Sequence, residues 1–367
     1  MILIVNLNLA VDHIVEVDDL RAGEVQRSRG ARSMAGGKGV NVARVLKTLG
    51  ERSLLLGFAG GRAGDLIESG LRAEQLASRC TRVREESRTC LIINDRRRCE
   101  QTVINAPGAA VAEAEWRDFE AAYTRELPGA NLVVINGSLP PNLHADTYAR
   151  LAMAARDAGR RVLLDCAGAP LRHALAARPF LVKINAAEAA EFEATEFQAT
   201  PLEPAGLEAT EIKWTKLSDM PIAEHSDVPV AKLSGVGLPA TNFSDADFSV
   251  AHPSGADFSG AARAARRLCE AGAENAMITL GAQGAMLDFA GVRYKFVAPR
   301  VRAVNSVGSG DAALAAFAAA LRQGLTPQAA GALAVAAGAA NALHGAGGCS
   351  ADEIAELLPR VGCELGQ

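Results

Sequence analysis

The length, composition and charge of the chain already exclude some classes of protein. The chain has 367 residues, of which 49% are hydrophobic and 22% are charged, and its formal net charge is −4. Proteins that bind nucleic acids carry a strongly basic balance, so we expect no nucleic-acid partner. The length allows two domains of about 150 residues or one large α/β domain.

The N-terminal segment and the cysteines indicate the compartment. Residues 1–19 (MILIVNLNLAVDHIVEVDD) contain no basic segment and no small-residue cleavage site, which favours a first strand over a signal peptide. No apolar run reaches the length of about 18 residues that a membrane span needs. The seven cysteines are scattered and form no C-x-x-C pair, as is typical of reduced thiols. We therefore expect a cytosolic protein without a membrane contact.

Short apolar runs alternate with helical patterns along most of the chain. The runs predict strands over 2–6, 53–58, 131–135, 161–165, 180–184 and 275–280. Spacing of the apolar residues predicts helices over 40–49, 65–77, 112–125, 145–158 and 260–271. This alternation predicts a three-layer α/β fold, in which helices cover both faces of a mostly parallel sheet. Sheets of this kind bind ligands at the carboxyl ends of their strands.

Three segments interrupt this alternation. Residues 13–33 and 89–104 are short, β-rich and half polar, which predicts a small antiparallel sheet that stands off the main one. Such a sheet is typical of a lid whose open face makes a dimer contact, although ordinary surface hairpins have the same pattern. Residues 196–256 are rich in proline and show no sustained period, so we expect a partly flexible insertion in a single domain that spans 1–367.

A glycine-rich turn near the C-terminus is the strongest sign of chemistry. The segment VNSVGSGD at 304–311 precedes an apolar helical pattern, so it predicts a strand, a turn and then a helix. Gly308, Ser309 and Gly310 would let the backbone enclose an anion at the helix N-terminus. Asp311 would lie in the first helical turn, where its carboxylate could take a proton from a hydroxyl group. The same residues are also typical of an ordinary N-cap and a tight turn.

A second glycine-rich segment, GGKGVNVAR at 36–44, opens a predicted helix. It is not a Walker A motif, because Gly39 follows Lys38 where that motif has Ser or Thr. Lys38 and Asn41 would face the same cleft, and the alternative is a glycine turn with a solvated lysine. The segment GFAGGRAGD at 57–65 lacks the spacing of a dinucleotide fingerprint, which argues against an oxidoreductase.

Polar residues follow several of the predicted strands. Asn185 and Glu188 are three residues apart on a helix start, where they could hold hydrated Mg²⁺ or simply cap the helix. Asp12 is expected just past the first strand and Arg88 just before a lid strand, and either could be surface charge. An anion site, a carboxylate, a magnesium-suited pair and two cations at one sheet edge indicate phosphoryl transfer from a nucleotide to a small anionic substrate.

The sequence resembles the PfkB carbohydrate kinases, which have the ribokinase-like fold. GGKGVNVARVLKTLG (36–50) and VNSVGSGDAALAAF (304–317) resemble the two signatures of the family, and INGSLPP (135–141), KINAAE (183–188) and ITLGAQGA (278–285) follow its order. The segment NSVGSGD is closest to the hexose-phosphate kinase branch, which includes 1-phosphofructokinase and tagatose-6-phosphate kinase. The resemblance covers nearly the whole chain except about 196–256. Leu9 and Ile184 stand where the family usually has proline.

The resemblance implies a role for each candidate residue. It implies that Asp311 is the base and that the anion hole is formed by Gly308, Ser309 and Gly310. It assigns sugar hydroxyls to Asp12, Gly37, Asn41 and Ser138, and the existing phosphate of the substrate to Lys38 and Arg88. It assigns the ATP phosphates and Mg²⁺ to Lys183, Asn185 and Glu188. It implies that the nucleotide pocket is lined by Thr279, Gly281, Gly284 and Asn341.

The sequence thus predicts an ATP-dependent kinase of a ketohexose phosphate. Fructose 1-phosphate is the favoured substrate, followed by tagatose 6-phosphate and fructose 6-phosphate, and the lid implies a homodimer. A kinase of a neutral sugar or nucleoside is an alternative. A non-catalytic sensor of sugar phosphates is another, but a sensor has no need of the carboxylates Asp311 and Glu188.

Overall fold

The computed structural model describes residues 1–98, 100–194 and 257–366. The predicted insertion at 196–256 therefore lies outside the described residues. No helix of the described part is long and apolar enough to cross a lipid bilayer. Every cysteine of that part is a free thiol.

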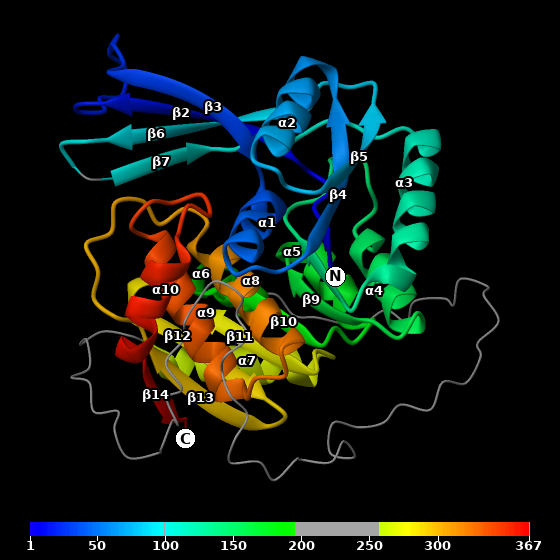
Figure 1. Cartoon of the computed structure of the whole chain (residues 1–367), viewed down its shortest axis with the longest axis vertical. Helices are drawn as coiled ribbons and strands as arrows, with labels where there is room; N and C mark the ends of the chain where they lie inside the picture. The colour runs from blue at the N-terminus through cyan, green and yellow to red at the C-terminus, as the bar shows by residue number, and fades with distance from the viewer. Residues whose placement is uncertain (99, 195–256, 367) are drawn as a thin grey trace.

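One large sheet forms the centre of the protein (Figure 1). In spatial order its strands are β14 (Gly362–Leu365), β13 (Val292–Val297), β12 (Gly284–Phe289), β11 (Asn275–Thr279), β10 (Leu181–Asn185), β9 (Arg161–Asp165), β8 (Leu132–Asn136), β1 (Ile2–Val5), β4 (Ser53–Gly60) and β5 (Ser78–Val83). All neighbours from β11 to β5 are parallel, whereas β12, β13 and β14 add an antiparallel edge. The prediction of a mostly parallel sheet is confirmed.

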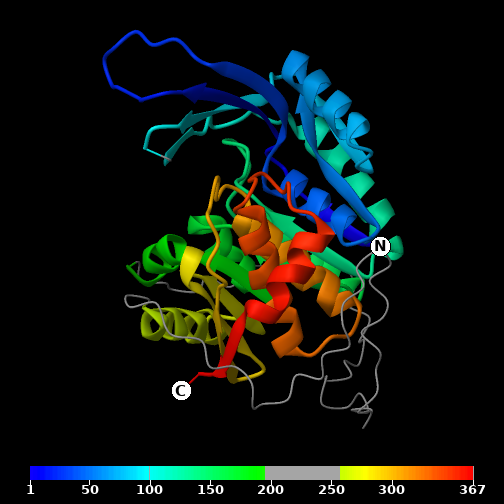
Figure 2. The same ribbon diagram turned by 60° about the vertical axis from the view of Figure 1, so that its left-hand side comes forward.

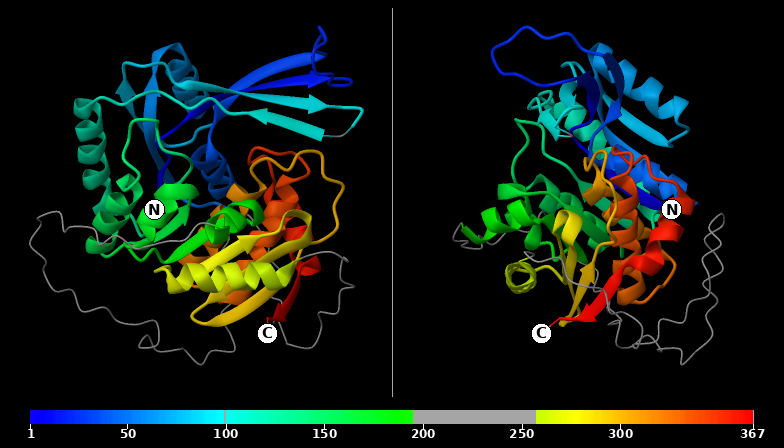
Figure 3. Two further views of the ribbon diagram at one scale, coloured as in Figure 1. Left: turned by 180° about the vertical axis from the view of Figure 1, so that it is seen from behind. Right: turned by 90° about the vertical axis from the view of Figure 1, so that its left-hand side faces the viewer.

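Helices cover both faces of this sheet (Figure 3). One face packs against α1 (Lys38–Thr48), α2 (Gly61–Ala73), α8 (Ser309–Arg322), α9 (Pro327–Asn341) and α10 (Ala351–Leu357). The other packs against α3 (Glu113–Glu126), α4 (Thr147–Asp157), α5 (Gly168–Leu175), α6 (Ala186–Ala194) and α7 (Phe258–Glu270). In β1, Ile2 and Ile4 join the first core while Leu3 and Val5 join the second. Because alternate side chains point to opposite faces, a strand buried on both sides must be apolar throughout.

A smaller sheet projects from the main body (Figure 2). Its strands in order are β3 (Gly30–Gly36), β2 (Ala10–Val17), β6 (Arg88–Asp95) and β7 (Glu100–Ile104). The prediction that this sheet is antiparallel is wrong for one pair, because β2 and β6 run parallel. The reason lies in the main sheet: β2 continues from β1 and β6 follows β5, and these parent strands already point the same way.

Some predicted elements differ in position from those of the structure. Helix α2 begins at Gly61, four residues before the predicted start at residue 65, so Gly61 and Gly64 lie within the helix. No strand immediately precedes the Gly-Ser-Gly turn, because β13 ends at Val297 and an irregular segment connects it to α8. Asp12 lies within β2 of the small sheet and not in the turn after the first strand.

Candidate active site

Four neighbouring strands of the main sheet end in a polar residue. Asn136, Asp165, Asn185 and Thr279 are the last residues of β8, β9, β10 and β11. Asn136 is in register with Asp165, and Asn185 with Thr279. Because parallel strands end at the same edge, these residues form a row along the carboxyl edge of the sheet, where such folds bind ligands.

Asp165 is the electrostatic centre of this row. Its side chain is fully buried, and its two oxygens each accept a hydrogen bond of 2.6 Å, one from Lys38 Nζ and one from Lys183 Nζ. Burial alone would raise the pKa of Asp165, but the two ammonium groups outweigh it and hold the pKa at about 2. The carboxylate is therefore ionised and fixes two positive charges side by side. Its signal in the sequence is RVLLD at 161–165, an apolar strand that ends in a carboxylate.

Asp311 lies at the N-terminal end of α8, next to this cluster. The N-cap of α8 is Gly308, so the interpretation of Asp311 as an N-cap is wrong. Its Oδ2 instead accepts a 2.9 Å hydrogen bond from Asn41 Nδ2. Burial and the charge of Asp165 raise the pKa of Asp311, while Lys38 and Lys183 act in the opposite sense. A raised pKa brings a carboxylate closer to the range in which a general base works well.

The glycines of the α8 turn lie close to these side chains. Gly308 has φ 81°, a left-handed conformation that glycine adopts without strain. A Cβ atom added at Gly310 would lie 2.6 Å from Lys183 Nζ, and one added at Gly308 would lie 3.2 Å from Asn41 Nδ2. The first turn of a helix also leaves backbone N–H groups without intrahelical acceptors. The turn and the lysines together can therefore receive a phosphoryl group.

The small sheet contributes the other side of the site. The Asp12 carboxylate faces Gly36, where an added Cβ would lie 2.1 Å from its Cγ. Burial raises the pKa of Asp12 to about 6, against the lowering effect of Arg44 and Arg88. Gly37 has φ 113°, and a Cβ there would lie 2.5 Å from Asn6 Oδ1. The backbone at 36–37 can thus approach these side chains only as glycine.

Arg88 and Ser138 lie near the junction of the two sheets. The Arg88 guanidinium donates to Asn8 O at 2.9 and 3.2 Å and to Ala106 O at 3.1 Å. Ser138 Oγ accepts a 3.0 Å hydrogen bond from Asn8 Nδ2. Arg88 is therefore anchored to the backbone, which the sequence does not predict, and this anchoring fixes its charge beside Asp12.

Asn185 and Glu188 cap the start of α6. Asn185 Oδ1 accepts from the amide of Glu188, and Glu188 Oε2 accepts from the amide of Asn185, both at 2.9 Å. The other carboxylate oxygen of Glu188 lies 3.5 Å from Lys38 Nζ. Within the described residues, no group of three or more His, Cys, Asp or Glu side chains is placed to hold a metal ion. The pair nevertheless fits Mg²⁺, which commonly keeps several waters and uses one or two carboxylates with substrate phosphates.

The residues predicted for the nucleotide pocket have different surroundings. Thr279 lies beside Asn185 at the sheet edge, and its Oγ1 is 3.5 Å from Ile184 O. Gly281 and Gly284 shape the connection from β11 to β12, and Gly284 has φ 118°. This connection lies farther along the sheet edge than the lysine cluster.

Asn341 is fully buried at the end of α9. Its Nδ2 donates to Val307 O at 2.9 Å and to Ser309 Oγ at 3.1 Å, and its Oδ1 accepts from the amide of Gly347. All of its polar atoms are thus engaged with the chain itself. Asn341 therefore holds the turn formed by residues 307–309 at the start of α8.

Asparagines near the N-terminus also support the site, although the sequence patterns do not single them out. Asn6 Oδ1 accepts a 3.1 Å hydrogen bond from the amide of Gly39, and Asn6 Nδ2 donates to Asn136 O at 3.3 Å. These contacts attach the start of α1 to the ends of β1 and β8. Asn6 directly follows the apolar strand β1, and Asn136 is the last residue of the apolar strand β8.

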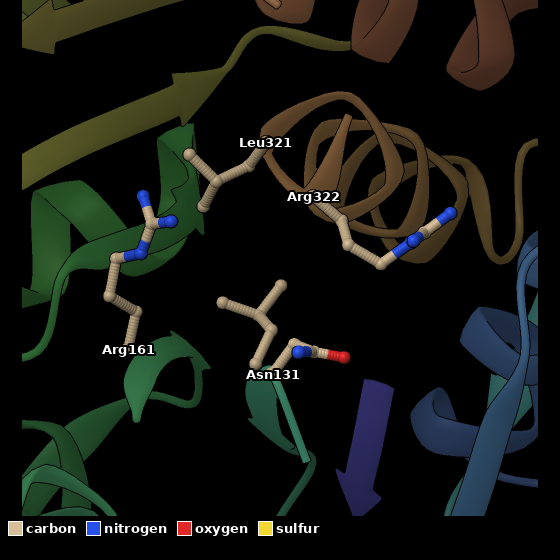
Figure 4. A pocket seen from close by; sticks show the side chains of 5 residues that line it. Asn131, Arg161, Leu321 and Arg322 are labelled. Atoms are coloured by element: carbon tan, nitrogen blue, oxygen red, sulfur yellow. The ribbon is translucent and has the colours of Figure 1, made fainter. Parts of the chain in front are cut away.

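A cavity of about 280 Å³ lies at the opposite edge of the sheet (Figure 4). Asn131, Leu132, Arg161, Leu321 and Arg322 line it. Arg322 is paired with Glu51, and the guanidinium of Arg161 lies 5.1 Å from the ring centroid of Phe180. None of the candidate residues lines this cavity, so it is separate from the site at the carboxyl edge.

The chain is similar to known proteins over almost its whole length. It matches the family described as pfkB family carbohydrate kinase over residues 2–208 and 229–353. A 1-phosphofructokinase from Bacillus subtilis strain 168 is 30% identical over 361 residues, which cover 98% of each chain. One from Xanthomonas campestris pv. campestris is 39% identical over 189 residues, 50% of this chain and 59% of the relative.

Solved structures share the same fold. The phosphofructokinase-2 of Escherichia coli, in complex with substrates and products, superposes with a TM-score of 0.76. The two chains are 24% identical, and 98% of each is covered. At this identity the likeness extends to the fold alone.

Proposed function

Because the chain belongs to the PfkB family of carbohydrate kinases and is an ATP-dependent sugar kinase, we propose that it phosphorylates a ketohexose phosphate. The favoured substrate is fructose 1-phosphate, which gives fructose 1,6-bisphosphate. One observation carries the proposal: a buried carboxylate, Asp311, lies at a glycine-rich helix N-terminus beside the paired ammonium groups of Lys38 and Lys183. The relatives named 1-phosphofructokinase support the choice of sugar phosphate.

In the proposed reaction, Asp311 takes the proton of the acceptor hydroxyl as that oxygen attacks the γ-phosphorus of ATP. A bond forms between the sugar oxygen and the γ-phosphorus, the bond from that phosphorus to the bridging oxygen breaks, and ADP leaves. Asn41 holds the Asp311 carboxylate by its 2.9 Å hydrogen bond. Proton transfer by a positioned group typically contributes a factor of about 10² to 10⁴ in rate.

The positively charged side chains of the site would bind different phosphate groups of the two substrates. Lys38 and Lys183 share Asp165, so both lie on the side where the phosphoryl group is transferred. The existing phosphate of a ketohexose 1-phosphate is at the other end of the sugar from the hydroxyl at carbon 6. We therefore assign this phosphate to Arg88. We assign the γ-phosphate to Lys38 and Lys183, which for Lys38 differs from the substrate-phosphate role that the family resemblance implies. Asp12 and Ser138 would bind the hydroxyls between the two ends.

Mg²⁺ would be held by Glu188 and Asn185 together with the phosphates of the nucleotide. When bound, it neutralises charge on the β- and γ-phosphates. Glu188 is suited to this role because its carboxylate faces Lys38 at the transfer side of the site. The nucleotide itself would extend past Thr279 towards the connection that contains Gly281 and Gly284.

We also propose a homodimer that forms through the small sheet. Val103 and Ile104 lie on β7, an edge strand of the small sheet, and are 39% and 56% exposed. An exposed apolar edge strand can pair with a second chain. The cytosolic location stays a prediction. Measuring the molar mass by light scattering tests the dimer, and a monomer at micromolar concentration would contradict it.

A substrate panel tests the proposed reaction. ADP release is measured with MgATP and fructose 1-phosphate, fructose 6-phosphate, tagatose 6-phosphate, fructose or ribose. We expect the highest kcat/KM with fructose 1-phosphate. Turnover of free sugars alone would overturn the proposal, and preference for one of the 6-phosphates would favour the corresponding alternative. Arg88→Ala should raise the KM for the phosphorylated sugar and leave that for ATP unchanged.

A further inference from the structure

Arg44 lies one helical turn beyond Asn41 on α1 and is almost completely buried. Its guanidinium makes two hydrogen bonds to Glu74, from Nε at 2.6 Å and from Nη2 at 2.7 Å. Nη2 also donates to Ala35 O at 2.7 Å, and Nη1 donates to Ala346 O and to Asn41 Oδ1, both at 3.1 Å. An arginine has five N–H donors, and the five bonds account for all of them.

The contact with Asn41 determines which way its side-chain amide points. An amide group has an oxygen that accepts hydrogen bonds and a nitrogen that donates them. Since Arg44 occupies Asn41 Oδ1, the Nδ2 side of the amide must face Asp311, and it does so at 2.9 Å. The opposite orientation would place the amide oxygen of Asn41 against the Asp311 carboxylate, where the two acceptors repel each other. It would also leave Arg44 Nη1 without this acceptor. Arg44 thus fixes the donor that holds Asp311.

The other partners of Arg44 come from three separate parts of the protein. Ala35 belongs to β3 of the small sheet, and Glu74 is the C-cap residue of α2. Ala346 lies in the loop after α9, where its own amide donates to Val307 O just before the α8 turn. Arg44 therefore connects the small sheet and the anion-hole loop to the pair formed by Asn41 and Asp311.

We propose that Arg44 is a positioning residue for phosphoryl transfer, which acts on Asp311 through Asn41 and touches neither substrate. The inference rests on the proposed role of Asp311 as the base. A lysine at this position would keep the charge but could not make five bonds in one plane, because its ammonium has three donors and no fork. Arg44→Lys should therefore disturb the orientation of Asn41 while it keeps the local charge.

The test compares Arg44→Lys with Lys47→Met, a matched control on the same helix. Lys47 Nζ donates to Glu74 O at 2.6 Å, so its loss weakens the contact between α1 and α2 without touching Asn41. We expect Arg44→Lys to lower kcat at least about tenfold, with the KM for ATP unchanged, whereas Lys47→Met lowers only the Tm. If both variants lower the Tm and neither changes kcat, Arg44 has a structural role only and the inference fails.

A double-mutant cycle tests whether the effect passes through Asn41. If it does, Asn41→Ala combined with Arg44→Lys should reduce kcat no further than Asn41→Ala alone. Reductions that multiply would overturn the inference. Should Arg44→Lys not fold, Glu74→Gln weakens the anchor of Arg44 and should lower kcat by a smaller factor, and an unchanged kcat would count against the inference.

Asp311→Asn separates the inference from the function on which it rests. If Asp311→Asn keeps the wild-type kcat, the proposed base is wrong and the role of Arg44 falls with it. If Asp311→Asn is inactive and Arg44→Lys keeps the wild-type kcat, only the role of Arg44 is wrong.

Discussion

The side-chain amide of Asn41 donates a 2.9 Å hydrogen bond to Oδ2 of Asp311, across 270 positions of the sequence. This bond joins the first turns of α1 and α8, the two helices that begin in the glycine-rich segments. It also stabilises the ionised form of a carboxyl group that burial makes harder to ionise. The ionisation state and the orientation of the Asp311 carboxylate thus depend on Asn41, which lies near the other end of the chain.

The pH dependence of kcat should reflect the raised pKa of Asp311. The base form is lost as pH falls through this pKa, so kcat should decline on the acid side at a higher pH than an ordinary Asp would give. Asn41→Ala removes a contact that lowers the pKa and should move this decline to still higher pH. A pH profile of kcat measures the shift. Asn142→Ala, which removes an asparagine paired with Val111, is the control and should not move it.

Glu188→Gln separates helix capping from magnesium binding. The amide oxygen of glutamine can still accept the hydrogen bond from Asn185 N, but the negative charge is gone. We expect the Mg²⁺ concentration for half-maximal activity to rise several-fold, with a loss of less than about 1 kcal/mol in the free energy of unfolding. Magnesium titrations and urea denaturation measure the two effects. An unchanged Mg²⁺ requirement would leave Glu188 with the capping role alone.

Gly310→Ala tests the close approach of the α8 turn to Lys183. The added methyl group would lie 2.6 Å from Lys183 Nζ, so the ammonium must move away from the α8 turn, where we propose that the γ-phosphate binds. We expect kcat/KM for ATP to fall about tenfold, which corresponds to about 1.4 kcal/mol of transition-state stabilisation. Gly129→Ala is the control, since its nearest neighbour would lie 3.8 Å away. Equal kinetics for the two variants would contradict this geometry.

Asp165→Asn should lower stability at neutral pH and change its dependence on acid. The lowered pKa means that Asp165 stabilises the fold above its ordinary pKa near 4 and loses this contribution as pH falls towards about 2. The variant leaves two lysines without their shared partner, which should cost about 3–5 kcal/mol at pH 7. Urea denaturation between pH 7 and pH 3 measures both effects. Asp157→Asn, at an exposed position, should show neither.

The strands of the main sheet could be predicted because their signal is local. A strand buried on both faces must be a continuous apolar run, and β9 begins and ends where the sequence predicts. The direction of β2 relative to β6 could not be predicted in this way. It depends on β1 and β5, which are separate strands of another sheet.

The sequence could predict most residues of the candidate site, but not which of their side chains contact one another. The polar strand ends and the glycine turns have local signals, and the structure brings Lys38, Asn41, Lys183 and Asp311 together. The role of Asp165 depends on lysines 127 and 18 positions away, and no spacing in the sequence reveals that they meet on one carboxylate. The same holds for Arg44, whose partner Ala346 is 302 positions away.

The kinetics of Asp311→Asn with MgATP and fructose 1-phosphate test the proposed reaction most directly. Asparagine keeps the shape of the side chain and removes its ability to accept a proton. We expect kcat to fall by a factor of about 10² to 10⁴ while the KM for both substrates changes little. Wild-type kcat in a correctly folded Asp311→Asn variant would contradict the assignment of Asp311 as the base.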